Sequence, residues 1–246
     1  METDLRKLEE KLHYCFKKKN LLLQALTHIS YAKQKDLNYN YERLEFLGDS
    51  VVNFLIVDIL TEKFTRMPLK KLAAAKAFLI SENFLSKLAK KWNVQDFIYL
   101  SRSEEIKGRR NSPSVLADVF EAIWAAIYVD SGRSIDFVKR LFRYHFEEEI
   151  IEAVRQGLYF DYKSILQEIT QSMFKEKPAY ELVKAEGPPH DQTFTVECKV
   201  KEFSTLGEGK TKKEAEQKAA QKMVEEHFKE KFQKKTKKGK DNPQNS

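Results

Sequence analysis

The chain has 246 residues, of which 41% are hydrophobic and 33% charged, and this composition predicts one or two folded domains and excludes a disordered protein. The formal net charge is +7, but residues 229–246 carry seven Lys against Glu230 and Asp241, a local charge of +5 that leaves +2 for the rest. Net charge therefore does not by itself indicate a nucleic-acid partner, because a solvated tail explains it equally well.

Nothing in the sequence suggests secretion or a membrane. No stretch resembles a signal peptide, and no apolar run approaches the roughly 20 residues needed to span a bilayer. Cys15 and Cys198 are far apart, with no CxxC pattern, which favours reduced thiols and argues against zinc. Cys198 alternates with apolar residues and is expected in a strand core. We therefore expect a cytoplasmic protein without a membrane partner.

Up to about residue 151 the apolar residues recur at helical spacing, which predicts an all-helical first domain. In chain order, the helical segments are residues 5–12, 21–31, 43–64, 69–92, 115–129 and 136–154. Helix-breaking residues separate them: Asn38, Asn40, Pro68, Asn93, residues 108–113, Ser131 and Gly132.

The pattern changes after Gly157. Residues 161–174 predict a short helix, whereas residues 178–187, 192–200 and 202–209 read as strands. Residues 210–228 predict a final helix whose buried side carries Ala215, Ala219, Ala220, Met223 and Phe228. The expected fold is an all-α domain at 1–154, a linker at 155–160, a small α+β domain of order α-β-β-β-α at 161–230, and a Lys-rich flexible tail at 231–246.

Two of the helical segments carry carboxylates in otherwise core-like sequence. Glu45 and Asp49 stand four residues apart in ERLEFLGDSVVNFLIV. Asp118 and Glu121 stand three apart in VLADVFEAIWAAIYV, which has no other charged residue. These spacings place both acids of a pair on one helical face. Burying an ionised carboxylate there is costly unless it is neutralised, has a partner or binds a cation. Since Arg43 is the only basic residue close to either pair, four oxygen donors on two facing helices predict a site for a divalent ion such as Mg²⁺.

The last predicted helix begins in a lysine cluster. Thr211 and Glu214 form a capping-box pattern that predicts where this helix starts. Lys210, Lys212 and Lys213 would then stand at its N-terminus, where free N–H groups and the helix dipole favour anions. This arrangement fits phosphate binding and the shape-based recognition of duplex RNA. A solvated surface helix is the equally weighted alternative.

Other motifs favour ordinary structural roles. GEGKT imitates the end of a nucleotide-binding P-loop, but the pattern requires Gly where the chain has Ser204, so no nucleotide cofactor is expected. His190 follows two prolines, which favours a turn residue over part of a metal dyad. The other histidines considered stand in helical segments and are expected to be packing or surface residues: His13, His28 and His145.

ERLEFLGDS (residues 42–50) resembles the most recognisable motif of ribonuclease III, and ADVFEAIWAAIYVDSG (117–132) resembles its second acidic segment. Residues from about 159 to 228 resemble the double-stranded RNA-binding domain of the bacterial enzymes, with PPHDQTFTVECKV and GEGKTKKEAEQKAA matching its motifs. The resemblance covers nearly the whole chain except the tail. It implies an endoribonuclease that depends on Mg²⁺, with Mn²⁺ able to substitute. Such an enzyme hydrolyses double-stranded RNA to 5′-phosphate and 3′-hydroxyl ends with short 3′ overhangs, and processes rRNA and other structured transcripts.

The resemblance also implies roles for single residues. The metal ligands would be Glu45, Asp118 and Glu121, joined by Asp49, which with Glu121 would be indispensable to catalysis. Glu42 would shape the site, and Phe46 would be buried in the partner subunit of a homodimer. The expected RNA-binding residues are Ser164, Gln167, Glu168 and Gln171 in one minor groove, His190 in the next, and Lys212 and Lys213 on the phosphates between.

Basic residues in SRSEEIKGRRNSP are candidates for guiding the RNA backbone, with a solvated loop as the equal alternative: Arg102, Lys107, Arg109 and Arg110. Two rival functions remain at this stage. A non-catalytic duplex-RNA-binding protein would lack one of the four acids, and all four are present. A nucleotide phosphohydrolase would leave the appended α-β-β-β-α module unexplained.

Overall fold

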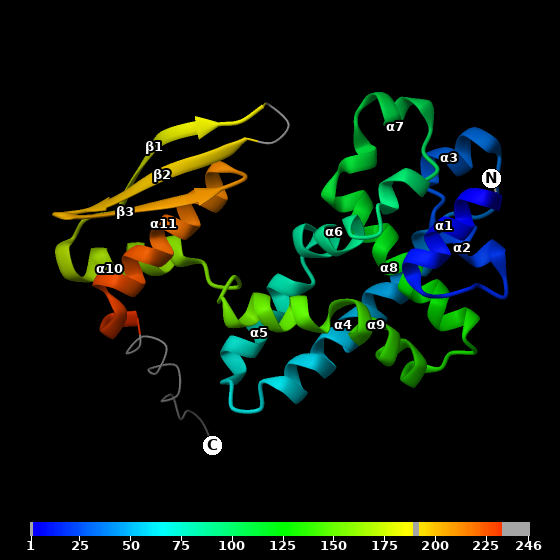
Figure 1. Cartoon of the computed structure of the whole chain (residues 1–246), viewed down its shortest axis with the longest axis horizontal. Helices are drawn as coiled ribbons and strands as arrows, with labels where there is room; N and C mark the ends of the chain where they lie inside the picture. The colour runs from blue at the N-terminus through cyan, green and yellow to red at the C-terminus, as the bar shows by residue number, and fades with distance from the viewer. Residues whose placement is uncertain (1, 189–191, 233–246) are drawn as a thin grey trace, which may run out of the picture. The chain divides into compact units, whose positions relative to one another are not determined.

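The computed structural model describes residues 2–188 and 192–232, and the chain divides after Tyr159 into two compact units (Figure 1). Unit 1 is helical, with α1 (Glu2–Leu12), α2 (Lys19–Ala25), α3 (Ile29–Lys35), α4 (Glu42–Lys63), α5 (Leu69–Leu79), α6 (Glu82–Lys90), η1 (Val94–Phe97), α7 (Arg102–Ile106), η2 (Arg109–Asn111), α8 (Pro113–Asp130) and α9 (Ile135–Arg155). Unit 2 contains α10 (Tyr162–Phe174), β1 (Ala179–Glu186), β2 (Thr193–Val200), β3 (Phe203–Gly209) and α11 (Lys212–His227). The predicted fold class is confirmed.

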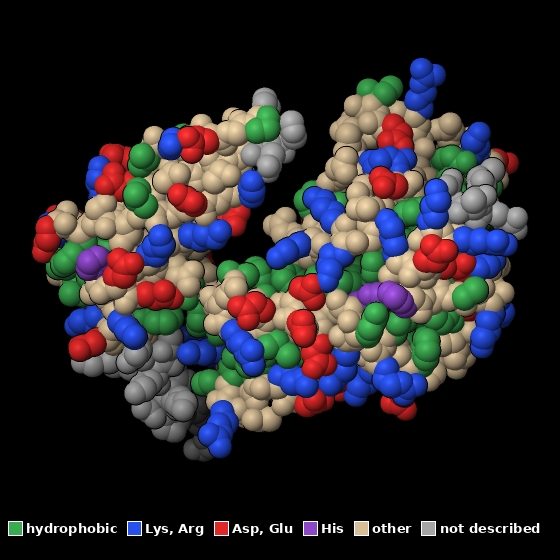
Figure 2. Space-filling model, viewed as in Figure 1, with side chains coloured by type: hydrophobic (Ala, Val, Ile, Leu, Met, Phe, Trp, Pro, Cys, Tyr) green, Lys and Arg blue, Asp and Glu red, His purple; other side chains and the backbone are tan. Residues whose placement is uncertain are grey.

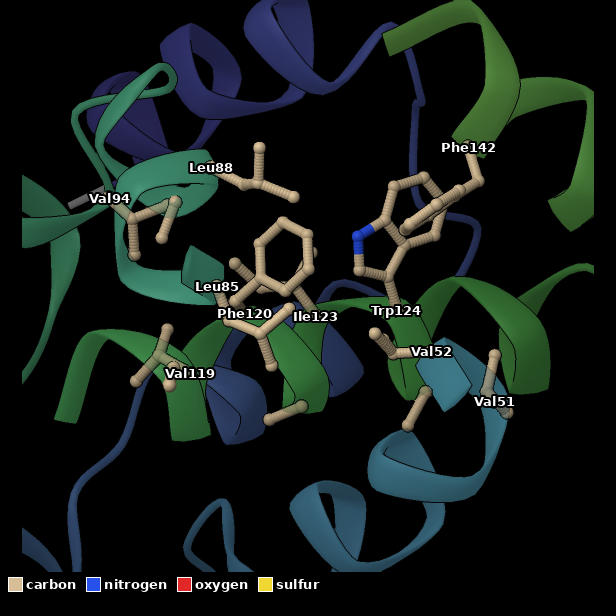
Figure 3. Packing of buried hydrophobic residues seen from close by; sticks show 14 of the residues in the cluster. Val51, Val52, Leu85, Leu88, Val94, Val119, Phe120, Ile123, Trp124 and Phe142 are labelled. Atoms are coloured by element: carbon tan, nitrogen blue, oxygen red, sulfur yellow. The ribbon is translucent and has the colours of Figure 1, made fainter. Parts of the chain in front are cut away.

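Helix α8 forms the centre of unit 1. Its sequence is apolar on nearly every side, and it packs against α4, α6 and α9. Phe120 and Trp124 are fully buried, and the ring of Phe120 lies 5.5 Å from that of Trp92 between centroids. The ring of Trp124 lies 5.0 Å from that of Phe142 (Figure 3). Each such side chain contributes on the order of 1.5–3 kcal/mol by leaving water. Any polar group on α8 is therefore held in a rigid frame.

Helices α4 and α8 approach each other closely at Gly48. A Cβ atom at this position would lie 2.1 Å from the backbone oxygen of Glu121, so only glycine allows this contact. Further along, α4 is tied to α9 by ion pairs, because Asp58 accepts hydrogen bonds from both Lys139 and Arg143 at 2.7 Å. Helix α4 is thus fixed against two neighbours, and its register relative to α8 is set.

Two predicted helical segments are each broken into two helices. Residues 21–31 are interrupted at His28, which is extended and whose ring Nδ1 accepts a hydrogen bond from the N–H of Ser30 as the N-cap of α3. Residues 69–92 are interrupted at Ser81, whose hydroxyl caps α6. The prediction was also wrong for His13, which follows α1 in a left-handed conformation. Periodicity alone misses such breaks because the apolar spacing continues across them.

Unit 2 is an antiparallel sheet of order β1-β2-β3, with α10 and α11 on one face (Figure 1). Cys198 pairs with Tyr180 and Thr205 across the sheet and is fully buried, as predicted for a strand-core residue. Helix α11 lies so close to β3 that a Cβ on Gly207 would meet the backbone of Ala215 and Ala219 at 2.2 Å. The predicted buried side of the helix is confirmed for all its members: Ala215, Ala219, Ala220, Met223 and Phe228.

No helix within residues 2–188 and 192–232 is both long and apolar enough to cross a membrane. Of the predicted Lys-rich tail at 231–246, residues 233–246 lie outside the described residues.

Candidate functional site

The four acids singled out from the sequence lie on the facing sides of α4 and α8. Glu45 and Asp49 flank Gly48, and Gly48 contacts the backbone of Glu121 directly. Asp118 stands one turn before Glu121 on α8. The close helix contact therefore brings the two pairs together, although 69 or more residues separate them in sequence.

The pKa values of three of these carboxyls, Glu45, Asp118 and Glu121, are raised above their ordinary values. Burial, followed by the charges of Asp118, Glu42 and Asp49, raises the pKa of Glu45 to about 7. Burial, followed by the charges of Asp49, Asp118 and Glu45, raises the pKa of Glu121 to about 8. Burial also raises the pKa of Asp118. The ionised forms are disfavoured because each lies partly desolvated beside other negative groups.

This donor set fits a divalent cation. No Lys, Arg or His counters the raised pKa of Glu45, Asp118 or Glu121 in the described part of the chain. Carboxylate oxygens are the ligands that Mg²⁺ prefers. Within the described ranges no group of three or more His, Cys, Asp or Glu side chains has the spacing of a metal-bound set. A bound divalent cation would favour the ionised carboxylates and so lower the pKa values that burial and the neighbouring acids raise.

Asp130, at the end of α8, is a buried carboxylate with a structural role and serves as a comparison for the acids of the candidate site. It is only 6% exposed, yet it accepts hydrogen bonds from the Tyr14 hydroxyl and from the backbone N–H groups of Lys17 and Lys18 at 2.8–2.9 Å. These donors lower its pKa below the ordinary value against the effect of burial. Glu45, Asp118 and Glu121 differ, because burial raises their pKa values and the charged groups that act on them are other acids.

Tyr41 is a site residue that sequence reasoning missed. Its side chain is 4% exposed, and its hydroxyl donates a hydrogen bond to Asp118 Oδ2 at 3.2 Å. This bond partly offsets the effect of burial on the pKa of Asp118. The available signal was a tyrosine directly before the acidic motif, because a buried tyrosine hydroxyl usually has a partner.

The two site-shaping candidates lie on the surface of α4. Glu42 is exposed at the first turn and accepts a hydrogen bond from the Asn40 side chain at 3.0 Å. Phe46, next to Glu45, is 85% exposed, which is unusual for so large an apolar side chain. Asp49 is exposed and accepts a hydrogen bond from Asn53 at 3.2 Å.

Most of the cations proposed to guide the RNA backbone have acidic partners. Arg110 pairs with Glu105 and also donates to a backbone carbonyl, while Lys107 and Arg109 pair with Glu104. Arg102 lies at the start of α7. On the face of unit 1 shown in Figure 2, basic and acidic side chains are likewise interspersed. Since Lys107, Arg109 and Arg110 have acidic partners, this segment does not form a continuous positive surface.

Unit 2 brings several predicted RNA-binding residues to one groove of about 720 Å³. Ser164 and Gln167 reach it from α10, and Lys212 and Lys213 reach it from the start of α11. The remaining α10 candidates, Glu168 and Gln171, are exposed but do not line this groove. The helix positions are set by N-caps, because Asp161 accepts from Ser164 in α10 and Thr211 accepts from Glu214 in α11.

Lys210 precedes the cap of α11, where its backbone N–H donates to Glu214 and its ammonium lies 3.3 Å from the Thr193 hydroxyl. The capping box is thus formed with one difference, since Glu214 reaches the N–H of Lys210 instead of that of Thr211. His190 lies outside the described residues.

Comparisons with known proteins agree with both units. Residues 18–144 match the family described as Ribonuclease-III-like, and residues 162–227 match the double-stranded RNA binding motif. Ribonuclease 3 of Aquifex aeolicus (strain VF5) is 50% identical over 215 residues, 87% of this chain and 93% of that protein. Ribonuclease 3 of Borreliella burgdorferi is 42% identical over 221 residues, 88% and 89% of the two chains.

A solved structure also matches unit 1. The nuclease domain of ribonuclease III from Campylobacter jejuni, described with a flexible region involved in its dimer formation, superposes with a TM-score of 0.52 at 42% identity. The match covers 57% of this chain and 96% of that one. Ribonuclease III enzymes are metal-dependent. With these relatives and a double-stranded RNA-binding unit, the chain belongs to the ribonuclease III family and is a double-strand-specific endoribonuclease.

Proposed function

We propose that Glu45, Asp49, Asp118 and Glu121 form the catalytic centre and bind Mg²⁺, with Mn²⁺ as a substitute. The observation that carries this proposal is the raised pKa of Glu45 and Glu121, which burial and the neighbouring acids cause without any compensating cation. Stability alone disfavours such a cluster, because each buried carboxyl costs free energy. A bound divalent ion offsets this cost.

A metal ion held by these four carboxylates would supply activation of a water molecule and stabilisation of charge on the phosphoryl and leaving oxygens. The protein's own part is to hold the carboxylates on two rigid helices, so that little reorganisation accompanies the reaction. Asp49 and Glu121 are the acids whose loss would abolish cleavage. Glu42, exposed at the first turn of α4, adds negative charge beside Glu45 and shapes the site. The products would be 5′-phosphate and 3′-hydroxyl ends with short 3′ overhangs.

The direct test compares Glu121→Gln with the wild type on a labelled RNA duplex, with and without Mg²⁺. Cleavage should disappear while duplex binding persists, because only unit 2 residues line the groove, whereas Glu121 belongs to α8 of unit 1. Glu152→Gln is the matched control, since Glu152 is exposed on α9 outside the acidic cluster. Undiminished cutting by Glu121→Gln would remove this residue from the mechanism.

A homodimer is part of the same proposal. Phe46 is 85% exposed and stands next to Glu45, so burying it in a partner subunit would remove a large apolar surface from water. Two sites in one dimer would each cut one strand of the duplex. Sedimentation of Phe46→Ser should show weakened dimerisation; an unchanged dimer would show that Phe46 is not at the interface.

For substrate binding we propose the groove of unit 2. Ser164, Gln167, Lys212 and Lys213 line it, and an exposed pair of lysines at a helix N-terminus suits phosphate. Glu168, Gln171 and Lys210 would contact the duplex beside it, and His190 would contact the next minor groove. Processing of rRNA and other structured transcripts in the cytoplasm is the expected setting.

A further inference from the structure

We propose that Tyr41 is a positioning residue for the metal site, which it serves by holding the Asp118 carboxylate through its hydroxyl. This inference rests on the proposed function, since it assumes that Asp118 is a metal ligand. Tyr41 itself would not contact the metal or the RNA. Its role is to fix one carboxylate oxygen so that the other remains directed toward the neighbouring acids.

The first support is geometric. Tyr41 Oη donates to Asp118 Oδ2 at 3.2 Å, a contact that joins positions 77 residues apart. The ring is 4% exposed and packs edge-on against His28 with the centroids 5.6 Å apart. Burial and ring packing restrict the rotation of the Tyr41 side chain, so its hydroxyl donates to the Asp118 carboxylate from a fixed position.

The backbone of Tyr41 is fixed from both sides. Its N–H donates to the carbonyl of Thr27 at 2.9 Å, and its own carbonyl accepts from the N–H of Glu45 at 2.9 Å. Tyr41 thus connects the first turn of α4, which carries Glu45, to Asp118 on α8. One residue touches both acidic pairs, whereas an ordinary core tyrosine would touch neither.

The hydrogen bond from Tyr41 opposes the repulsion that Asp118 meets from other acids. The charge of Glu82 raises the pKa of Asp118, and Asp118 in turn raises the pKa values of Glu45 and Glu121. Without a donor, the Asp118 carboxylate can rotate away from Glu45 and Glu121. The hydrogen bond also withdraws some negative charge from the oxygen that accepts it, which weakens a ligand slightly. Orientation is the larger effect, since loss of an outer-shell partner typically lowers metal affinity about 10–100-fold.

The experiment measures binding of Mn²⁺ alone to the full chain, by titration followed with electron paramagnetic resonance. Tyr41→Phe removes only the hydroxyl and keeps the buried ring. We expect about tenfold or greater weakening of Mn²⁺ binding, while duplex binding without metal stays at the wild-type level. In cleavage assays the Mg²⁺ concentration for half-maximal rate should rise, with the rate at saturating Mg²⁺ largely recovered.

Tyr14→Phe is the matched control. It also deletes a tyrosine–aspartate hydrogen bond in unit 1, from Tyr14 to Asp130 at 2.8 Å, but at a carboxylate outside the acidic cluster. It should lower the unfolding temperature and leave Mn²⁺ affinity unchanged. A Tyr41→Phe protein with wild-type Mn²⁺ affinity would overturn the proposal, and so would one that loses its folded circular dichroism, because the role of Tyr41 would then be structural.

The outcomes separate this inference from the proposed function. If the wild type and Glu121→Gln bind Mn²⁺ equally, or neither binds it, the acidic cluster is not the metal site and both ideas fail. If Glu121→Gln loses Mn²⁺ and Tyr41→Phe retains full affinity, the metal site stands and only the role of Tyr41 is wrong.

Discussion

Replacing Gly48 by Ala tests whether the close contact of α4 and α8 positions the acids. The new Cβ would lie 2.1 Å from the Glu121 backbone oxygen and 2.4 Å from its carbonyl carbon. Reaching ordinary contact at 3.4 Å requires the helices to separate by about 1.3 Å. Both partners are backbone atoms, so no flexible side chain can absorb this shift.

This displacement of α4 from α8 should lower the cleavage rate more than it lowers the stability of the domain. Overpacking of this kind costs about 1–3 kcal/mol, which corresponds to a fall of about 2–12 °C in unfolding temperature for a domain of this size. A domain with about 5–15 kcal/mol of stability remains folded at room temperature. Displacing Glu121 by about 1 Å relative to Glu45 and Asp49 should lower the cleavage rate about 100-fold. The fall in cleavage rate should therefore be larger than the fraction of unfolded Gly48→Ala protein can account for.

Calorimetry and single-turnover cleavage of a labelled duplex measure the two effects. Gly132→Ala is the control, because Gly132 has φ +77° with nothing within 4 Å, so Ala there adds backbone strain of about 1–2 kcal/mol without moving α8 against α4. It should lose stability and keep cleavage. If Gly48→Ala cleaves at the wild-type rate, the reasoning that links helix contact to catalysis is refuted.

Two other predictions concern pH and salt. In the folded chain the pKa values of Glu45 (about 7) and Glu121 (about 8) lie above the ordinary value of 4.5. Between pH 4.5 and about 8 the folded chain therefore holds more protons than the unfolded chain, so the unfolding free energy without metal should fall as pH rises through this window. Urea unfolding at both ends of the window should show a smaller fall for Glu121→Gln than for the wild type; equal falls would mean that Glu121 does not titrate there. Replacing both Lys212 and Lys213 by Ala should weaken duplex binding and reduce the slope of log affinity against log salt by about 2, whereas Lys199→Ala, in β2, should not. An unchanged slope in the double variant would show that these lysines do not contact phosphate.

Much of the fold and the acidic residues could be predicted from local sequence. The helical period locates α4, α8 and α9, the alternation of apolar residues locates β1 and β2, and Thr211 correctly marks the start of α11. A spacing of three or four residues also places two acids on one helical face, because the side-chain direction is set by the helix itself. These features need no knowledge of what packs against the segment.

Contacts between distant segments were decided only by the tertiary structure. The break at His28 depends on a short bridge that pairs Thr27 with Tyr99, and the acids of α4 meet those of α8 because Gly48 lets two backbones touch. The Tyr41 bond to Asp118 likewise spans 77 residues. The physical reason is that a sequence period states which face of an element is apolar or acidic, whereas packing selects the neighbour of that face and so sets burial, hydrogen bonds and pKa values.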